Sequence, residues 1–93
     1  MVVGVTRWDL HLPASQSLKD KRRVVKSLKD RLHARFGVAV AEVDHQELWQ
    51  RAAIAAATVS GDLRHAEEVL TSCDRLVQSE PAATILANET SWL

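Results

Sequence analysis

A chain of 93 residues with 46% hydrophobic and 26% charged residues has the composition of a soluble globular protein, and we expect one domain spanning residues 1–93. Twelve Lys and Arg balance twelve Asp and Glu, so the formal net charge of zero excludes a long-range field that steers partners. The single cysteine excludes an internal disulfide and a thiolate zinc site. Neither an apolar run of membrane-spanning length nor a signal-peptide pattern is present, so we expect a cytoplasmic protein without membrane association.

The N-terminal third predicts a strand followed by a long helix. Residues 2–12 alternate with period two, and the face that includes Trp8 is the better candidate for the core. Ser17 and Asp20 form a capping-box pattern, with Asp in place of the usual Glu or Gln. An apolar stripe then continues over about five helical turns. Gly37 stands where such a helix is expected to end.

Two further strands are expected in the middle of the chain. Residues 38–43 are rich in valine and alanine and predict a short strand. A polar connection at 44–50 leads to residues 52–60, where alanine favours a helix but the Thr-Val-Ser ending and the break after it favour a strand. We interpret 52–60 as a strand whose small side chains allow close packing.

The last third predicts a second helix and a final strand. Asp62 is a suitable N-cap, and the apolar residues after it share one helical face as far as Glu80 and Pro81. Residues 84–89 predict the last strand, and residues 91–93 a short tail. The expected core between helices and sheet consists of Trp8, Leu18, Val25, Leu28, Leu32, Val69, Leu70 and Leu76.

The resulting order, β-α-β-β-α-β, is that of the ferredoxin-like fold in the α+β class. Right-handed crossovers place both helices on one face of a four-stranded antiparallel sheet. The other face stays open. Its valines and alanines predict a flat, mildly apolar surface, through which, or through a strand edge, we expect a homodimer.

Two strings of sequence resemble a known family. They are Ser17–Arg23 (SLKDKRR) and Ala41–Arg51 (AEVDHQELWQR). With the opening VVGV and the closing SWL, they make the whole chain similar to the YlxP-like family of small bacterial proteins. The resemblance implies the same ferredoxin-like fold and a link to translation, because members are often encoded near termination, initiation and ribosome-maturation factors. It implies no catalytic residue, and the alanine-rich strand at 52–60 departs from the family pattern.

The first helix carries a row of basic side chains at helical spacing. We predict that they form a nucleic-acid-binding face: Lys19, Arg22, Arg23, Lys26 and Lys29. Like charges at such spacing cost a helix about 0.2–0.5 kcal/mol per pair, and the earliest ones also oppose the helix dipole. A polyanion would neutralise these charges and offset the cost, so we predict binding to the phosphates of RNA, ribosomal RNA above all, or to an acidic protein partner. The alternative is a solvated helix face.

The polar connection carries a second candidate site. We predict that His45, Gln46 and Trp49 form an interaction surface, because Trp is enriched at interfaces. The alternative is that Trp49 folds back over the edge of the sheet. RNA recognition by the sheet itself is not expected, because modules of that kind stack bases on aromatic residues of the central strands, and residues 52–60 contain none.

Neither a catalytic nor a metal site is predicted. Asp9, His11 and His45 are the nearest approach to a set of metal ligands, but their spacing matches no known motif. Glycine-rich phosphate loops and hydrolase motifs are missing from the sequence, so we expect no enzyme activity and no cofactor. The predicted function is a non-enzymatic RNA- or ribosome-associated accessory factor. A homo-oligomeric interaction module and a small-ligand regulatory module, both using the open sheet face, remain as alternatives.

Overall fold

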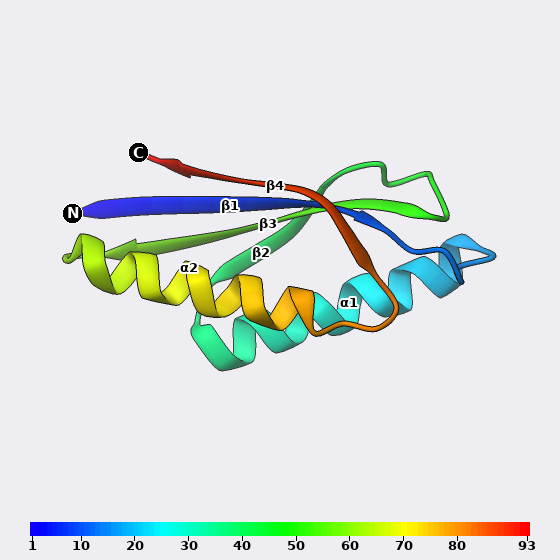
Figure 1. Ribbon diagram of the computed structural model, residues 1–93, viewed down its shortest axis with the longest axis horizontal. Coiled ribbons are helices and arrows are strands. Elements are labelled where there is room, and N and C mark those ends of the chain that lie inside the picture. The colour runs from blue at the N-terminus through cyan, green and yellow to red at the C-terminus, as the bar shows by residue number, and fades with distance from the viewer.

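The computed structural model describes all 93 residues and contains six elements. In chain order these are β1 (Val2–His11), α1 (Leu18–Phe36), β2 (Ala39–Asp44), β3 (Arg51–Ser60), α2 (Leu63–Gln78) and β4 (Thr84–Trp92) (Figure 1). The strand order in the sheet is β2-β3-β1-β4, and every neighbouring pair is antiparallel. Each helix therefore connects two parallel strands that a third strand separates, which confirms the predicted ferredoxin-like fold.

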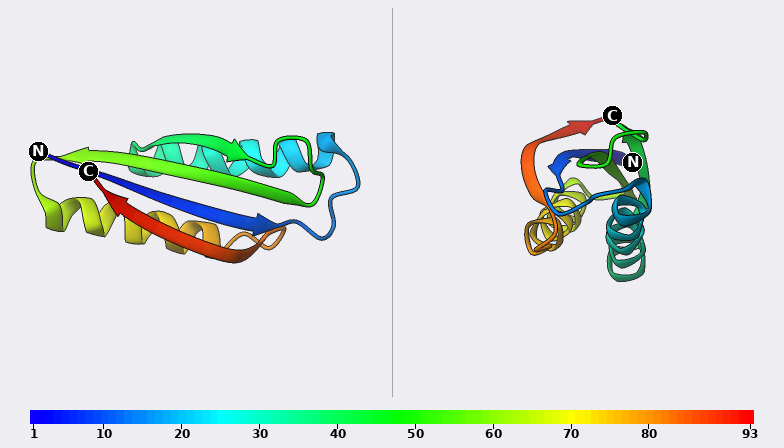
Figure 2. Two further views of the ribbon diagram at one scale, coloured as in Figure 1. Left: turned by 90° about the horizontal axis from the view of Figure 1, so that it is seen from above. Right: turned by 90° about the vertical axis from the view of Figure 1, so that its right-hand side faces the viewer.

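Both helices cover the same face of the sheet, and the opposite face is open, as the end-on view shows (Figure 2). The alternation along β1 decides which side chains each face receives. Trp8 and Leu10 are fully buried beneath the helices, whereas Arg7 and Asp9 lie on the open face. Six of the eight expected core residues are buried, while Leu18 and Val69 are only partly buried.

The ends of both helices follow the expected capping chemistry. Oγ of Ser17 accepts a hydrogen bond from the backbone N–H of Asp20 at 3.0 Å, and the carboxylate of Asp62 caps α2 in the same manner. Gly37 adopts φ 66°, a left-handed conformation that ends α1 and suits glycine because it has no Cβ. Neither helix is long and apolar enough to cross a membrane.

The last strand is longer than predicted. It continues to Trp92 instead of ending at Glu89, so the expectation of a tail from residue 91 is wrong. The register places Trp92 opposite Gly4 of β1. A Cβ atom on Gly4 would lie 2.5 Å from a ring carbon of Trp92. The missing side chain of Gly4 therefore makes room for the indole ring, and the backbone pairing with β1 holds the polar end of β4 in the sheet.

Candidate functional site

The basic face of α1 (Lys19, Arg22, Arg23, Lys26 and Lys29) points away from the sheet. All of these residues are exposed except Lys29, which is half-buried. Nζ of Lys26 lies 2.6 Å from Oδ2 of Asp30, and this hydrogen bond lowers the pKa of the Asp30 carboxyl. None of the other four has an ion pair within 4.0 Å. The protein itself thus leaves most of this positive charge unneutralised.

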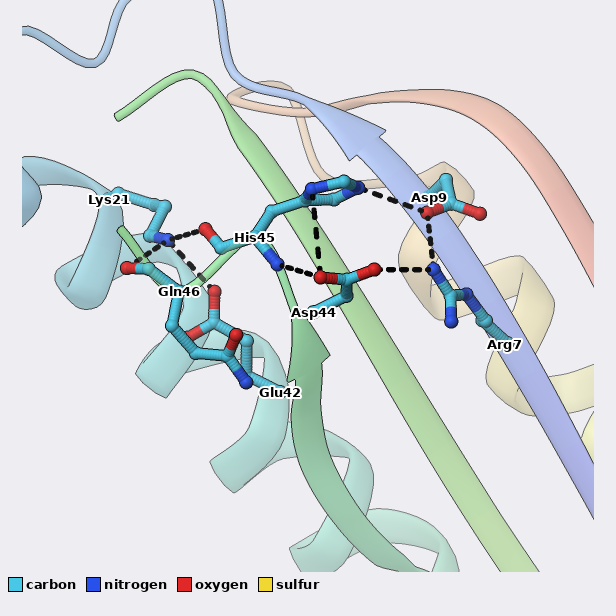
Figure 3. Close-up of polar contacts among 7 residues, drawn as sticks. All are labelled: Arg7, Asp9, Lys21, Glu42, Asp44, His45 and Gln46. Atoms are coloured by element: carbon cyan, nitrogen blue, oxygen red, sulfur yellow. Dashed lines mark hydrogen bonds and ion pairs between the residues drawn. The ribbon is translucent and has the colours of Figure 1, made fainter. Parts of the chain in front are cut away.

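Lys21 belongs to the opposite side of α1. It stands four residues before Val25 in the apolar row, and its side chain is 0% exposed. Nζ donates hydrogen bonds to the backbone oxygens of His45 at 2.7 Å and Gln46 at 2.9 Å (Figure 3). It also lies 2.9 Å from Oε2 of Glu42, near enough for an ion pair although not aligned for a hydrogen bond. These contacts offset the free-energy cost of removing the ammonium group from water.

The connection between β2 and β3 is attached at its beginning to the first turns of α1 and at its end to residues 12–15, which precede α1. At its beginning, the contacts of Lys21 hold two successive carbonyl groups. At its end, the backbone oxygen of Gln50 accepts from the N–H of Leu12 at 2.9 Å. The side-chain amide of Gln50 donates to the oxygens of Pro13 at 3.3 Å and Ser15 at 3.2 Å. The loop 45–50 is therefore fixed beside the first turns of α1.

The tip of this loop exposes two large apolar side chains. His45 has φ 60°, which is unusual outside glycine, and its backbone oxygen accepts from the N–H of Leu48 at 3.0 Å to close a turn. Leu48 is 48% exposed and Trp49 54% exposed. Trp49 thus keeps more than half of its surface in solvent. Gln46, the third residue of the predicted interaction site, is exposed as well.

Charged side chains cross the open face of the sheet beside this loop (Figure 3). Nη2 of Arg7 lies 3.2 Å from Oδ1 of Asp9 and 3.6 Å from Oδ2 of Asp44. The hydrogen bond with Asp9 raises the pKa of Arg7, and the backbone N–H of His45, which donates to Oδ1 of Asp44 at 2.7 Å, lowers the pKa of Asp44. Nε2 of His45 is 3.8 Å from Oδ1 of Asp9. Arg7 thus pairs with both carboxylates of the cluster, and no group of three or more potential ligands is arranged to hold a metal ion.

The remainder of the open face is apolar and shallow. Val59 on this face is 68% exposed. A depression of about 230 Å³ is lined entirely by small or medium apolar residues: Val5, Ala39, Val40, Ala41, Ala55, Ala56 and Ala57. The small side chains of β2 and β3 thus leave a nearly flat surface.

A larger hollow of about 380 Å³ lies between α2 and β4. At its polar centre, the carboxylate of Asp74 accepts from Nε1 of Trp8 at 2.9 Å and from Nδ2 of Asn88 at 3.2 Å. The other oxygen of Asp74 accepts from Nε2 of Gln78 at 2.7 Å. We assign Asp74 a structural role, because its oxygens are engaged in satisfying the buried indole and neighbouring amides.

The structure places the loop of the second predicted site beside the helix of the first. The loop that carries His45, Gln46 and Trp49 lies against the first turns of the helix that bears the basic face. Lys21, which joins them, is absent from the predicted site residues because it stands within a run of charged residues. Its register with the apolar stripe, four residues before Val25, is the signal that identifies a buried lysine.

Comparison with known proteins shows the family. Residues 3–90 match the family described as "Protein of unknown function (DUF503)". The chain belongs to this family. Over 91 residues it is 28% identical to "Uncharacterized protein YlxP" of Bacillus subtilis (strain 168), covering 98% of this chain and 99% of that protein. The resemblance of the sequence to the YlxP-like family is thereby confirmed.

Solved structures of similar shape have low sequence identity. A C-terminal segment of the alpha subunit of aIF2 from Pyrococcus abyssi has a TM-score of 0.47 and 18% identity, and covers 100% of this chain but 49% of that one. A dimeric ferredoxin-like protein from an uncultured marine organism has a TM-score of 0.43 and 8% identity, over 99% and 86% of the two chains. At these values the likeness says nothing about function.

Proposed function

We propose that the protein is a non-enzymatic RNA-binding factor that contacts phosphate groups through the basic face of α1. The observation that carries this proposal is that four of its five side chains have no ion pair with the protein. Because the net charge of the chain is zero, attraction to RNA must arise from this local concentration of charge. Ribosomal RNA is the favoured target, since the family resemblance points toward translation.

The position of the aromatic residues supports contact through the helix. In the central strands β1 and β3 the only aromatic residue is Trp8, which is 0% exposed beneath the helices. Base stacking on the open sheet face, the route used by RRM modules, therefore has no aromatic platform in these strands. The basic face, in contrast, is exposed along several turns. Repulsion between its like charges destabilises the helix by about 0.2–0.5 kcal/mol per neighbouring pair. Neutralisation by phosphates would remove this repulsion.

The salt dependence of binding tests the proposal. Affinity for a labelled fragment of ribosomal RNA is measured by fluorescence anisotropy between about 50 and 200 mM salt. If about four phosphates are contacted, log affinity should fall with log salt with a slope of roughly −3 to −4. Arg22→Gln combined with Lys29→Gln should weaken binding and flatten the slope by about one to two units.

A matched control removes the same charge from the other helix. Arg64→Gln combined with Arg75→Gln deletes two exposed cations of α2 and should leave affinity and slope unchanged. Equal loss in the two double variants would contradict a specific role of α1. Stronger binding to polyglutamate than to RNA at the same salt would assign the basic face to an acidic protein partner instead.

We also infer that a second copy of the chain covers the open sheet face. The four strands contain 10, 6, 10 and 9 residues, which at about 3.3 Å per residue and about 4.8 Å between strands give roughly 550 Å² on each copy. Two copies would bury about 1,100 Å², slightly more than the roughly 1,000 Å² that a biological interface should exceed. The guanidinium of Arg7 lies between the carboxylates of Asp9 and Asp44 on this face, which offsets part of the negative charge that one copy would present to the other.

Sedimentation or light scattering at high micromolar concentration tests this interface. Ala55→Glu places a charge in the middle of the shallow apolar depression and should convert a dimer to a monomer. Ser72→Glu on the helix side offers a control of equal charge that should leave the dimer intact. A wild-type protein that stays monomeric at these concentrations would contradict the inference.

A further inference from the structure

We propose that the tip of loop 45–50 and the N-terminal half of the basic face form one surface for unpaired nucleotides of RNA. In this surface Trp49 stacks on a base while the first cations of α1 contact the flanking phosphates. The inference deepens the proposed function and rests on it, because it names unpaired RNA as the substrate class of the same helix.

The first step of the argument is the fixed position of the loop. Lys21 lies between Lys19 and Arg22 in the chain, and its buried ammonium holds the carbonyls of His45 and Gln46. The amide of Gln50, next to Trp49, holds the carbonyl of Ser15, four residues before Lys19. Trp49 thus belongs to a loop that contacts at both ends hold beside the first turns of α1, where the basic face begins.

The second step is the exposure of Trp49 itself. A Trp that is 54% exposed on a loop held by hydrogen bonds presents a ring without the freedom of a disordered segment, so little entropy is lost when a base stacks on it. Stacking on an aromatic side chain tolerates every base and requires that the base be unpaired. Leu48, 48% exposed beside it, extends the apolar contact area.

The third step is the location of the other aromatic residues. Trp8 is 0% exposed, and Trp92 pairs with Gly4 at the opposite end of β1 from the loop (Figure 1). Phe36 lies at the far end of α1 with Arg35 over its ring. Trp49 is therefore the aromatic side chain of the loop that is held beside the first turns of α1.

The experiment compares single-stranded oligo(U) of about 12 nucleotides with duplex RNA of the same length at one salt concentration. Trp49→Ala should weaken oligo(U) binding roughly 5- to 150-fold, the equivalent of losing one stacked base, and should leave duplex affinity within about twofold. Trp49→Phe should retain most of the affinity because it keeps an aromatic face. In a Trp92→Phe background, oligo(U) should quench the fluorescence of Trp49, and the duplex should not.

The outcomes separate this inference from the proposed function. An equal loss for oligo(U) and duplex, or no loss for either, would overturn the stacking role of Trp49 while the basic face remains an RNA-binding surface. If the wild-type protein binds neither RNA at low salt, the proposed function fails, and the stacking surface fails with it. Trp92→Phe alone serves as the control for loss of an indole and should bind oligo(U) as the wild type does.

Discussion

The buried ammonium of Lys21 provides the sharpest test of the structure. Lys21→Met keeps a long, flexible side chain at the position but removes the charge and its donors. The carboxylate of Glu42, whose side chain is 16% exposed, then loses its cation. The backbone oxygens of His45 and Gln46 lose the donor that lies 2.7 and 2.9 Å away. We expect a large loss of stability, and a loop that is no longer fixed beside α1.

The magnitude follows from the contacts. Removal of one partner from a buried ion pair costs about 3–5 kcal/mol, and each hydrogen bond from a charged donor contributes about 1.5–3 kcal/mol, although these contributions are not additive. Glu42 keeps some contact with water, and the methionine adds apolar burial, so we expect about 3 kcal/mol. For a domain of this size, 1 kcal/mol corresponds to about 4–8 °C in Tm, so the midpoint should fall by roughly 12–24 °C.

Urea denaturation followed by circular dichroism measures this loss. Lys19→Met removes an exposed lysine from the same helix and should change the free energy of unfolding by less than about 0.5 kcal/mol. Lys21→Met combined with Glu42→Leu should recover most of the stability, because an apolar pair often replaces a buried ion pair at little cost. A loss below about 1 kcal/mol in the single variant, or a double variant no more stable than the single one, would refute the reasoning.

Three further predictions concern the core. Leu28→Ala should lower the free energy of unfolding by about 2–5 kcal/mol because Leu28 is 0% exposed. An unchanged urea midpoint would contradict the packing of this face of α1 in the core. Gly4→Ala should lower the free energy of unfolding by roughly 1–3 kcal/mol, because the new Cβ would lie 2.5 Å from Trp92 and 2.9 Å from Leu70. A variant with the stability and the Trp92 fluorescence of the wild type would show that the ring moves aside freely. Burial raises the pKa of the Cys73 thiol to about 11, so the folded protein keeps a proton that the unfolded chain releases from about pH 9. The free energy of unfolding should therefore fall between about pH 9 and 11 more steeply in the wild type than in Cys73→Ala, and equal slopes would contradict the shift.

The fold was predictable because its signals are local. The alternation of β1, the cap at Ser17 and the glycine at position 37 each follow from residues within one or two turns of the chain. The alanine-rich segment at 52–60 is a strand, as predicted, although alanine favours helix. Pairing with β1 on one side and β2 on the other, together with burial of Ile54 beneath the helices, outweighs that preference.

The errors arose where distant contacts decide the structure. Residues 88–91 (Asn-Glu-Thr-Ser) lack the apolar alternation of a strand, and only the ladder with β1 keeps β4 extended as far as Trp92. The link between the two predicted sites also depends on a pair far apart in sequence, Lys21 with the carbonyls of His45 and Gln46. The sequence identifies the basic face and the loop separately, but the attachment of the loop to the start of α1 follows only from such long-range contacts.

The attachment of loop 45–50 has a consequence for how the protein can change. Lys21 donates hydrogen bonds to main-chain oxygens at the beginning of the loop, and every amino acid supplies such an oxygen. At the end of the loop, the side chain of Gln50 donates to main-chain oxygens of the segment before α1. The side chains at positions 46 to 49 make none of these hydrogen bonds, so we expect that they can be exchanged without releasing the loop. The molecule thus separates the part that sets the shape of this surface from the part that sets its chemistry, which makes these four positions a natural site for redesigning what it recognises.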